Sequence, residues 1–63
     1  MKKQMSDTHK KRRAYLWEHS PISRILEERD YGSCSEFVTD AHGDVDTYRV
    51  YGTSKANFEL TMR

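Results

Sequence analysis

The stretch SEFVTDAHGDVDTYRVYG, residues 35–52, decides the fold. Polar and apolar residues alternate on both sides of His42-Gly43, which is typical of two half-buried strands joined by a tight turn. A two-residue hairpin loop favours positive φ at both central positions, which glycine adopts easily and histidine tolerates. This turn predicts the following cross-strand pairs: Ala41 with Asp44, Thr39 with Asp46, Phe37 with Tyr48, Ser35 with Val50, and Glu36 with Arg49 on the opposite face.

A second turn, at residues 52–56, predicts that the chain returns as a third strand. Pairing Tyr51 with Asn57 would place Val50 opposite Phe58 and Tyr48 opposite Leu60. Both turns then put the same large side chains on one face: Phe37, Tyr48, Val50, Phe58, Leu60 and Met62. Because a shift by one residue would expose the whole apolar set of a strand, this agreement supports the register.

The residues before Gly32 have the pattern of helices. Ser6, Asp7 or Thr8 can cap a helix that begins near residue 8. In SPISRILEERDYG, Ser20 suits an N-cap and Pro21 suits the first helical position. Its apolar residues follow a helical spacing: Ile22, Ile25 and Leu26. Since a proline disfavours helical backbone at the residue before it, a break near Ser20 is favoured over a single kinked helix.

The sequence therefore predicts an α+β fold in a single small domain of 63 residues. An N-terminal helix or two short helices, over about residues 8–31, would pack on a three-stranded antiparallel β-meander. We expect its strands at about residues 34–41, 45–51 and 57–63, and a loose segment at residues 1–6. The apolar face would be covered by Ile22, Ile25 and Leu26, and one end filled by Trp17 with Leu16 or Tyr15.

Composition argues against several classes of protein. Cys34 is the single cysteine, so no internal disulfide forms, and a lone thiol fits the reducing cytoplasm. The three histidines lack the spacing of a structural zinc site, and we expect no metal and no cofactor. No stretch approaches the roughly 18 apolar residues of a membrane span. Nucleophile and P-loop motifs are absent from the sequence, and so short a chain has little room for a pocket of ~300 Å³, so we do not expect an enzyme.

One longer segment resembles part of a known family. SRILEERDYGSCSEFVTDAHGDVDTYRV looks like the second half of a winged-helix domain, in which a helix runs into a two-stranded wing. Asp30 stands where that family usually has a glycine, and Pro21 falls where the turn between two helices needs room. The resemblance is an analogy of fold, and no functional residue is carried over from it.

The charge is distributed unevenly along the chain. Residues 1–13 have a net charge of +5, and the other fifty residues have a net charge of −4. A basic segment beside aromatic residues is typical of contact with the phosphates of DNA or RNA, although it also occurs as a solubilising terminus. The candidate nucleic-acid-binding residues are Lys3, Lys10, Lys11, Arg12 and Arg13.

The leading hypothesis is thus a small, non-catalytic, cytoplasmic regulator or accessory protein that binds nucleic acid. The alternative is a modulator or inhibitor of a larger protein, acting through the exposed sheet face or an edge strand. The candidate protein-binding residues on that face are Val38, Thr47, Arg49 and Tyr51. Dimerisation through the same face or edge would supply stability that so small a core lacks.

Overall fold

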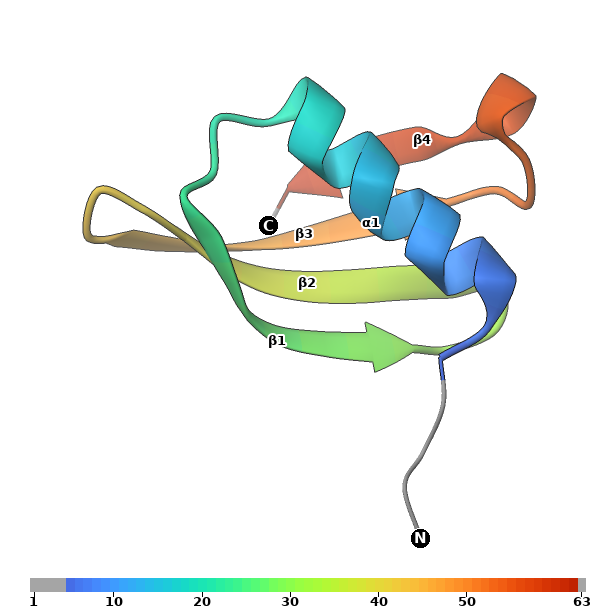
Figure 1. The fold of residues 1–63 in the computed structure, drawn as a ribbon, viewed down its shortest axis with the longest axis horizontal. Helices are drawn as coiled ribbons and strands as arrows, with labels where there is room; N and C mark the ends of the chain where they lie inside the picture. The colour runs from blue at the N-terminus through green and yellow to red at the C-terminus, as the bar shows by residue number, and fades with distance from the viewer. Residues whose placement is uncertain (1–4, 63) are drawn as a thin grey trace, which may run out of the picture.

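The computed structural model describes residues 5–62 and has an α+β architecture (Figure 1). Its elements follow one another along the chain: α1 (Asp7–His19), β1 (Arg24–Asp30), β2 (Cys34–Ala41), β3 (Asp44–Tyr51), the short 3-10 helix η1 (Lys55–Asn57) and β4 (Glu59–Met62). Each strand pairs antiparallel with the next, so the sheet is a meander with β1 and β4 at its edges. The helix α1 crosses one face of this sheet.

The hairpin of β2 and β3 is confirmed in every predicted pair. Ala41 lies opposite Asp44, Phe37 opposite Tyr48, and the register continues without a shift to Cys34 and Tyr51. At the turn, His42 has φ 56° and Gly43 has φ 94°, as a two-residue hairpin loop requires. The Gly43 N–H also donates to the Asp40 carboxylate at 3.1 Å, which holds the turn closed.

The last strand is present, but its register differs from the predicted one by two residues. Val50 pairs with Leu60 and Tyr48 pairs with Met62. The difference arises because η1 includes Asn57 and has Phe58 as its C-cap, so β4 begins at Glu59 rather than at residue 57. A shift of two leaves the same side chains on the same face, since side chains alternate with a period of two. The predicted set of side chains therefore still shares one face of the sheet, although the pairing differs.

The prediction of a helix between residues 20 and 31 is wrong. The helix α1 ends at His19, as the break near Ser20 predicted, but residues 24–30 form β1, so the sheet has four strands. The resemblance to a winged-helix domain fails for the same reason, because the segment that should be its helix is a strand. Of the segment at residues 1–6 that we expected to be loose, residues 1–4 lie outside the described residues, and Ser6 is the N-cap of α1.

A β-bulge explains why β1 was hard to recognise. Ile25 pairs with Thr39 and Glu27 pairs with Val38, so Leu26 is the extra residue of the bulge and the alternation breaks there. Beyond the bulge, the inward positions of β1 belong to acids, Glu28 and Asp30, rather than to apolar residues. A strand with a bulge and charged inward positions has no apolar period of two.

The core lies between α1 and the sheet and is small. Its buried apolar side chains are Leu16, Phe37, Tyr48, Val50 and Phe58, with Tyr15, Ile22, Ile25 and Leu60 packed against them. Trp17 and Leu26, both expected in the core, are 45% and 44% exposed, and Met62 is 58% exposed. The rest of the buried face of α1 consists of two polar residues, His9 and Arg12.

Candidate functional site

The structure divides the predicted cations of α1 between the surface and the interior. Lys10 and Lys11 are exposed, Arg13 is half-buried, and Arg12 is completely buried, while Lys3 lies outside the described residues. Successive residues of an α-helix are about 100° apart around its axis, so four consecutive cations cannot share one face. The expectation that all of them meet a partner is therefore wrong for Arg12.

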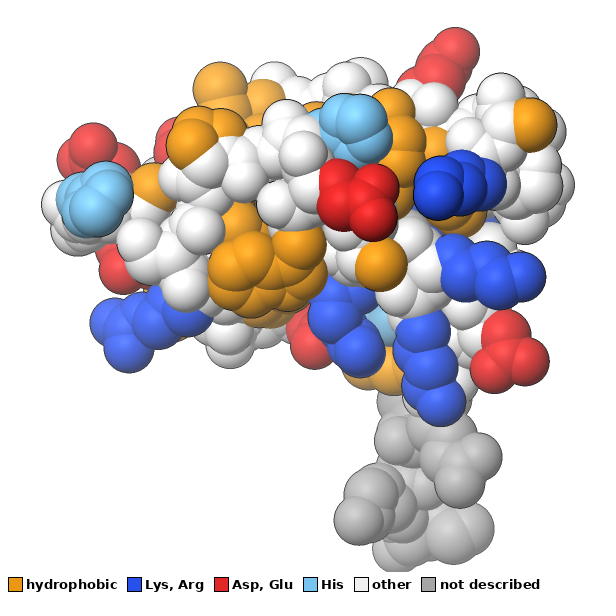
Figure 2. Space-filling model, turned by 45° about the horizontal axis from the view of Figure 1, so that its top comes forward, with side chains coloured by type: hydrophobic (Ala, Val, Ile, Leu, Met, Phe, Trp, Pro, Cys, Tyr) orange, Lys and Arg blue, Asp and Glu red, His pale blue; other side chains and the backbone are white. Residues whose placement is uncertain are grey.

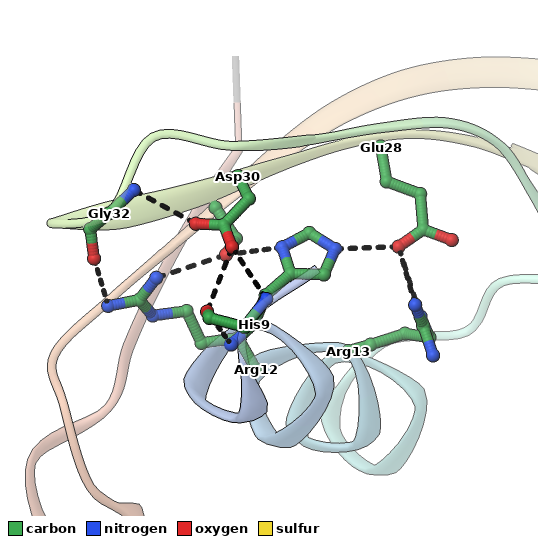
Figure 3. Close-up of polar contacts among 8 residues, drawn as sticks. His9, Arg12, Arg13, Glu28, Asp30 and Gly32 are labelled. Atoms are coloured by element: carbon green, nitrogen blue, oxygen red, sulfur yellow. Dashed lines mark hydrogen bonds and ion pairs between the residues drawn. The ribbon is translucent and has the colours of Figure 1, made fainter. Parts of the chain in front are cut away.

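Arg12 is instead a structural side chain that joins three segments. Figure 3 shows its contact with Gly32. Its guanidinium donates from Nη2 to the Gly32 carbonyl at 3.0 Å and from Nε to the Gly52 carbonyl at 2.9 Å. Its Nη1 donates to the Ser35 hydroxyl at 3.1 Å. Gly32 and Gly52 both have positive φ, and a side chain at Gly52 would collide with the Asn57 carbonyl. Arg12 thus fixes α1 against the connections at one end of the sheet.

His9 forms the second half of this buried cluster. Its Nδ1 lies 2.8 Å from the Ser35 hydroxyl, and its Nε2 lies 2.7 Å from Oε1 of Glu28 on β1. The same Glu28 oxygen accepts from Nε of Arg13 at 3.0 Å. With Nε2 protonated, His9 donates to Glu28 and accepts from the Ser35 hydroxyl, which satisfies both ring nitrogens.

A serine, a histidine and a carboxylate in hydrogen-bonding order invite comparison with a nucleophilic triad. Ser35 and His9 are both 0% exposed, however, and the Ser35 oxygen also accepts from Arg12. A nucleophile must reach its substrate, so this arrangement cannot act as one in the folded structure. We interpret the cluster as polar packing between α1, β1 and β2.

Two carboxylates of β1 have shifted pKa values because of these contacts. Burial opposes the charged form of Glu28, but the hydrogen bonds from His9 and Arg13 together outweigh it and lower the pKa of Glu28. Backbone N–H groups of Ser6 and Gly32, together with the Ser6 hydroxyl, lower the pKa of Asp30 to about 2. Both acids therefore stay ionised and bind the beginning of α1 to the sheet.

The exposed side of α1 carries the cations that remain available. Lys10 and Lys11 project from this side, and Lys55 is exposed on η1. Figure 2 shows lysine and arginine side chains gathered in the right half of the view, on the side where α1 begins and η1 lies. We call Lys10, Lys11 and Lys55 the basic face. Arg13 borders it, but its charge is partly balanced by Glu28.

An open groove of about 400 Å³ runs between α1 and η1 beside the basic face. The residues that line it are Lys11, Ala14, Tyr15, Glu18, Ser54, Lys55 and Phe58. This volume falls within the range of small-molecule sites. The groove is therefore larger than we expected for so short a chain. The Tyr15 and Phe58 rings meet edge to face, with centroids 5.3 Å apart. The groove thus combines aromatic surface with lysines from two separate elements.

The four residues predicted to bind a protein lie on the other face of the sheet. Val38 and Thr47 are cross-strand partners there, and Arg49 and Tyr51 follow on β3. Tyr51 is exposed, while the other three are partly covered by their neighbours. In the described part of the chain, no element packs over this face, since α1 covers the opposite one.

Ion pairs occupy much of this outer face. Arg49 Nε lies 3.2 Å from Glu36, as the predicted register required, and Arg29 of β1 approaches the same carboxylate at 3.6 Å. The hydrogen bond from Arg49 lowers the pKa of Glu36. Tyr31 also donates to Glu36 at 3.3 Å. The outer face is therefore close to neutral, in contrast to the basic face.

The part of the chain that the structure describes has no candidate metal site and no candidate membrane span. Among residues 5–62, no three His, Cys, Asp or Glu side chains are grouped in a way that could hold a metal ion. In the same part of the chain, no helix has the length and apolar character to cross a membrane. Cys34 is a buried free thiol at the start of β2.

Comparison of the chain with protein-family models, with curated proteins and with solved structures found no match. Sequence reasoning found Lys10 and Lys11 and noted aromatic residues beside them, but it missed Lys55 and Phe58 as parts of the same surface. No local pattern could have joined them, because Lys55 meets α1 only after the whole sheet has formed.

Proposed function

We propose that this protein binds nucleic acid through the basic face of α1 and η1. Lys10, Lys11 and Lys55 contact phosphates, and Arg13 adds a weaker contact because it also binds Glu28. The observation that supports this most is the arrival of Lys55, 44 positions beyond Lys11 in the sequence, at the same groove as Lys11. Arg12 is left out of this surface, since its donors are held by backbone carbonyls and Ser35.

Binding to a labelled oligonucleotide, followed by fluorescence anisotropy at about 50 mM salt, tests the proposal. The double variant Lys10→Ala/Lys11→Ala should bind at least about tenfold more weakly, because two phosphate contacts are lost. A matched control, Arg24→Ala/Arg29→Ala, removes the same charge from β1, on the far side of the sheet from the helix. That control should stay within about threefold of the native protein. Equal losses in both variants, or no binding by the native protein, would contradict the proposal.

A second candidate function is contact with a larger protein through the outer sheet face. It is favoured by the absence of a covering element over that face in the described residues, and by the exposed Tyr51. Capture of one defined protein from nuclease-treated lysate, lost in Tyr51→Glu, would support this candidate. Capture that requires intact nucleic acid would support the basic face instead.

A further inference from the structure

We infer that the groove between α1 and η1 holds a base of single-stranded nucleic acid, with the adjoining phosphate at Lys11 and Lys55. This rests on the proposed function and adds to it the form of the ligand. The basic face alone would accept any polyanion. The groove beside it gives a reason to prefer a strand whose bases are free.

The lining of the groove fits a flat ring. Ala14, Tyr15 and Phe58 provide its apolar surface, and the Tyr15 ring contacts two other aromatic rings. It meets Phe58 edge to face and lies against the His19 ring, with centroids 4.2 Å apart. An aromatic side chain that is fixed by its neighbours and still partly exposed is a suitable platform for stacking a base.

The charges at the groove fit a phosphate attached to that ring. Lys11 reaches the groove from α1 and Lys55 from η1, so a negative group can be held from two elements. Glu18 lies two helical turns beyond Lys11, about 10 Å along the axis, and repels phosphate from that end. A nucleotide unit has a flat ring with a stacking face and an adjoining anion, so it fits this arrangement.

A duplex fits this surface less well than a single strand. Its bases are stacked and paired, so none can enter a groove on the protein surface without being flipped out. A duplex has the greater charge density, however, and a protein that only gripped phosphates would prefer it. The preference between the two forms therefore separates a base in the groove from a purely electrostatic grip.

The test uses a fluorescein-labelled DNA strand of about ten nucleotides, alone and annealed to its complement, at about 50 mM salt. The native protein should bind the single strand more tightly than the duplex. Ala14→Leu fills the groove without changing charge and with little change in helix preference, and Ala14 is exposed, so the fold should be kept. Ala56→Leu is the matched control, because Ala56 is an exposed alanine of η1 that does not line the groove.

Ala14→Leu should weaken single-strand binding about tenfold and leave duplex binding within about twofold, since only the stacking contact is lost. Ala56→Leu should change neither. Equal or tighter binding of duplex by the native protein, or an Ala14→Leu variant with unchanged single-strand affinity, would overturn the inference and leave the proposed function standing. Failure to bind either form at low salt would remove the proposed function and the inference together.

Discussion

Three hydrogen bonds from the Arg12 guanidinium reach three segments of the chain, at Gly32, Ser35 and Gly52. A charge in the interior is costly unless its donors are satisfied, and the planar fork of arginine satisfies several acceptors at once. A lysine has one nitrogen on a flexible stem and cannot reach the same set. At this position the type of cation matters, whereas at the exposed lysines only the charge matters.

We expect Arg12→Lys to lower the free energy of unfolding by about 2 kcal/mol or more, because buried acceptors lose their donors. Arg13→Lys is the matched control on the neighbouring, half-buried position, and should cost about 0.5 kcal/mol or less. Urea denaturation followed by circular dichroism measures both. Equal losses of unfolding free energy in the two variants would show that the burial of Arg12 does not determine its contribution to stability.

Asp30 should make stability depend on pH in the acidic range. Its pKa is about 2 in the folded protein, below the ordinary value of 3.8, so folding favours the ionised carboxylate. That contribution is complete above the unfolded pKa and is lost as the pH falls from about 4 toward 2. The difference in unfolding free energy between the native protein and Asp30→Asn should therefore shrink over this range, as measured by urea denaturation at each pH. A difference that stays constant down to pH 2 would contradict the assignment.

At the scale of elements, the two serines that bracket α1 have opposite environments. The Ser6 hydroxyl accepts from the His9 N–H at 3.1 Å and donates to Asp30 at 2.8 Å, so it caps the helix and joins it to β1. The Ser20 hydroxyl, at the other end, is buried without a hydrogen-bond partner among the described residues. The same residue type thus stabilises one end of the helix and adds nothing evident at the other.

Ser6→Ala should lower the free energy of unfolding by about 1 kcal/mol, because the first turn of α1 loses its cap. Ser20→Ala should change it by less than about 0.5 kcal/mol or raise it slightly, since an unpaired buried hydroxyl is removed. Chemical denaturation of the pair under identical conditions gives the comparison. A larger loss in Ser20→Ala than in Ser6→Ala would contradict the assignment of Ser6 as the stabilising cap.

The elements also differ in how far the sequence could predict them. The β2–β3 hairpin was predictable to the residue, because His42-Gly43 fixes the turn and both strands alternate. Strand β1 was not predictable, because its bulge at Leu26 interrupts the period of two and its inward Glu28 meets His9 and Arg13 only in the folded chain. Single-sequence patterns treat a charged residue as exposed, so a polar interface between helix and sheet leaves no apolar signal.

For the whole molecule, the fold separates charge by face. Ion pairs such as Arg49 with Glu36 nearly neutralise the outer sheet face, and the inward Glu28 of β1 is paired with His9 and Arg13. The lysines of the basic face remain exposed. Two of them were predicted from the basic run, and the third, Lys55, is placed beside α1 by the path of the meander. Only the assembled fold brings that third cation to α1, so the sequence could predict the basic run but not the surface.

This arrangement predicts how binding of a single strand should depend on salt. Each phosphate contact contributes about −0.7 to the slope of log K against log salt, so three lysines give a slope of about −2. Removing Lys10, Lys11 or Lys55 singly should reduce the steepness by about 0.7 each, and Lys55→Ala should act like the other two although it lies far from them in sequence. Anisotropy titrations over a series of salt concentrations measure these slopes. An unchanged slope in Lys55→Ala would show that η1 takes no part in the binding surface and would confine it to α1.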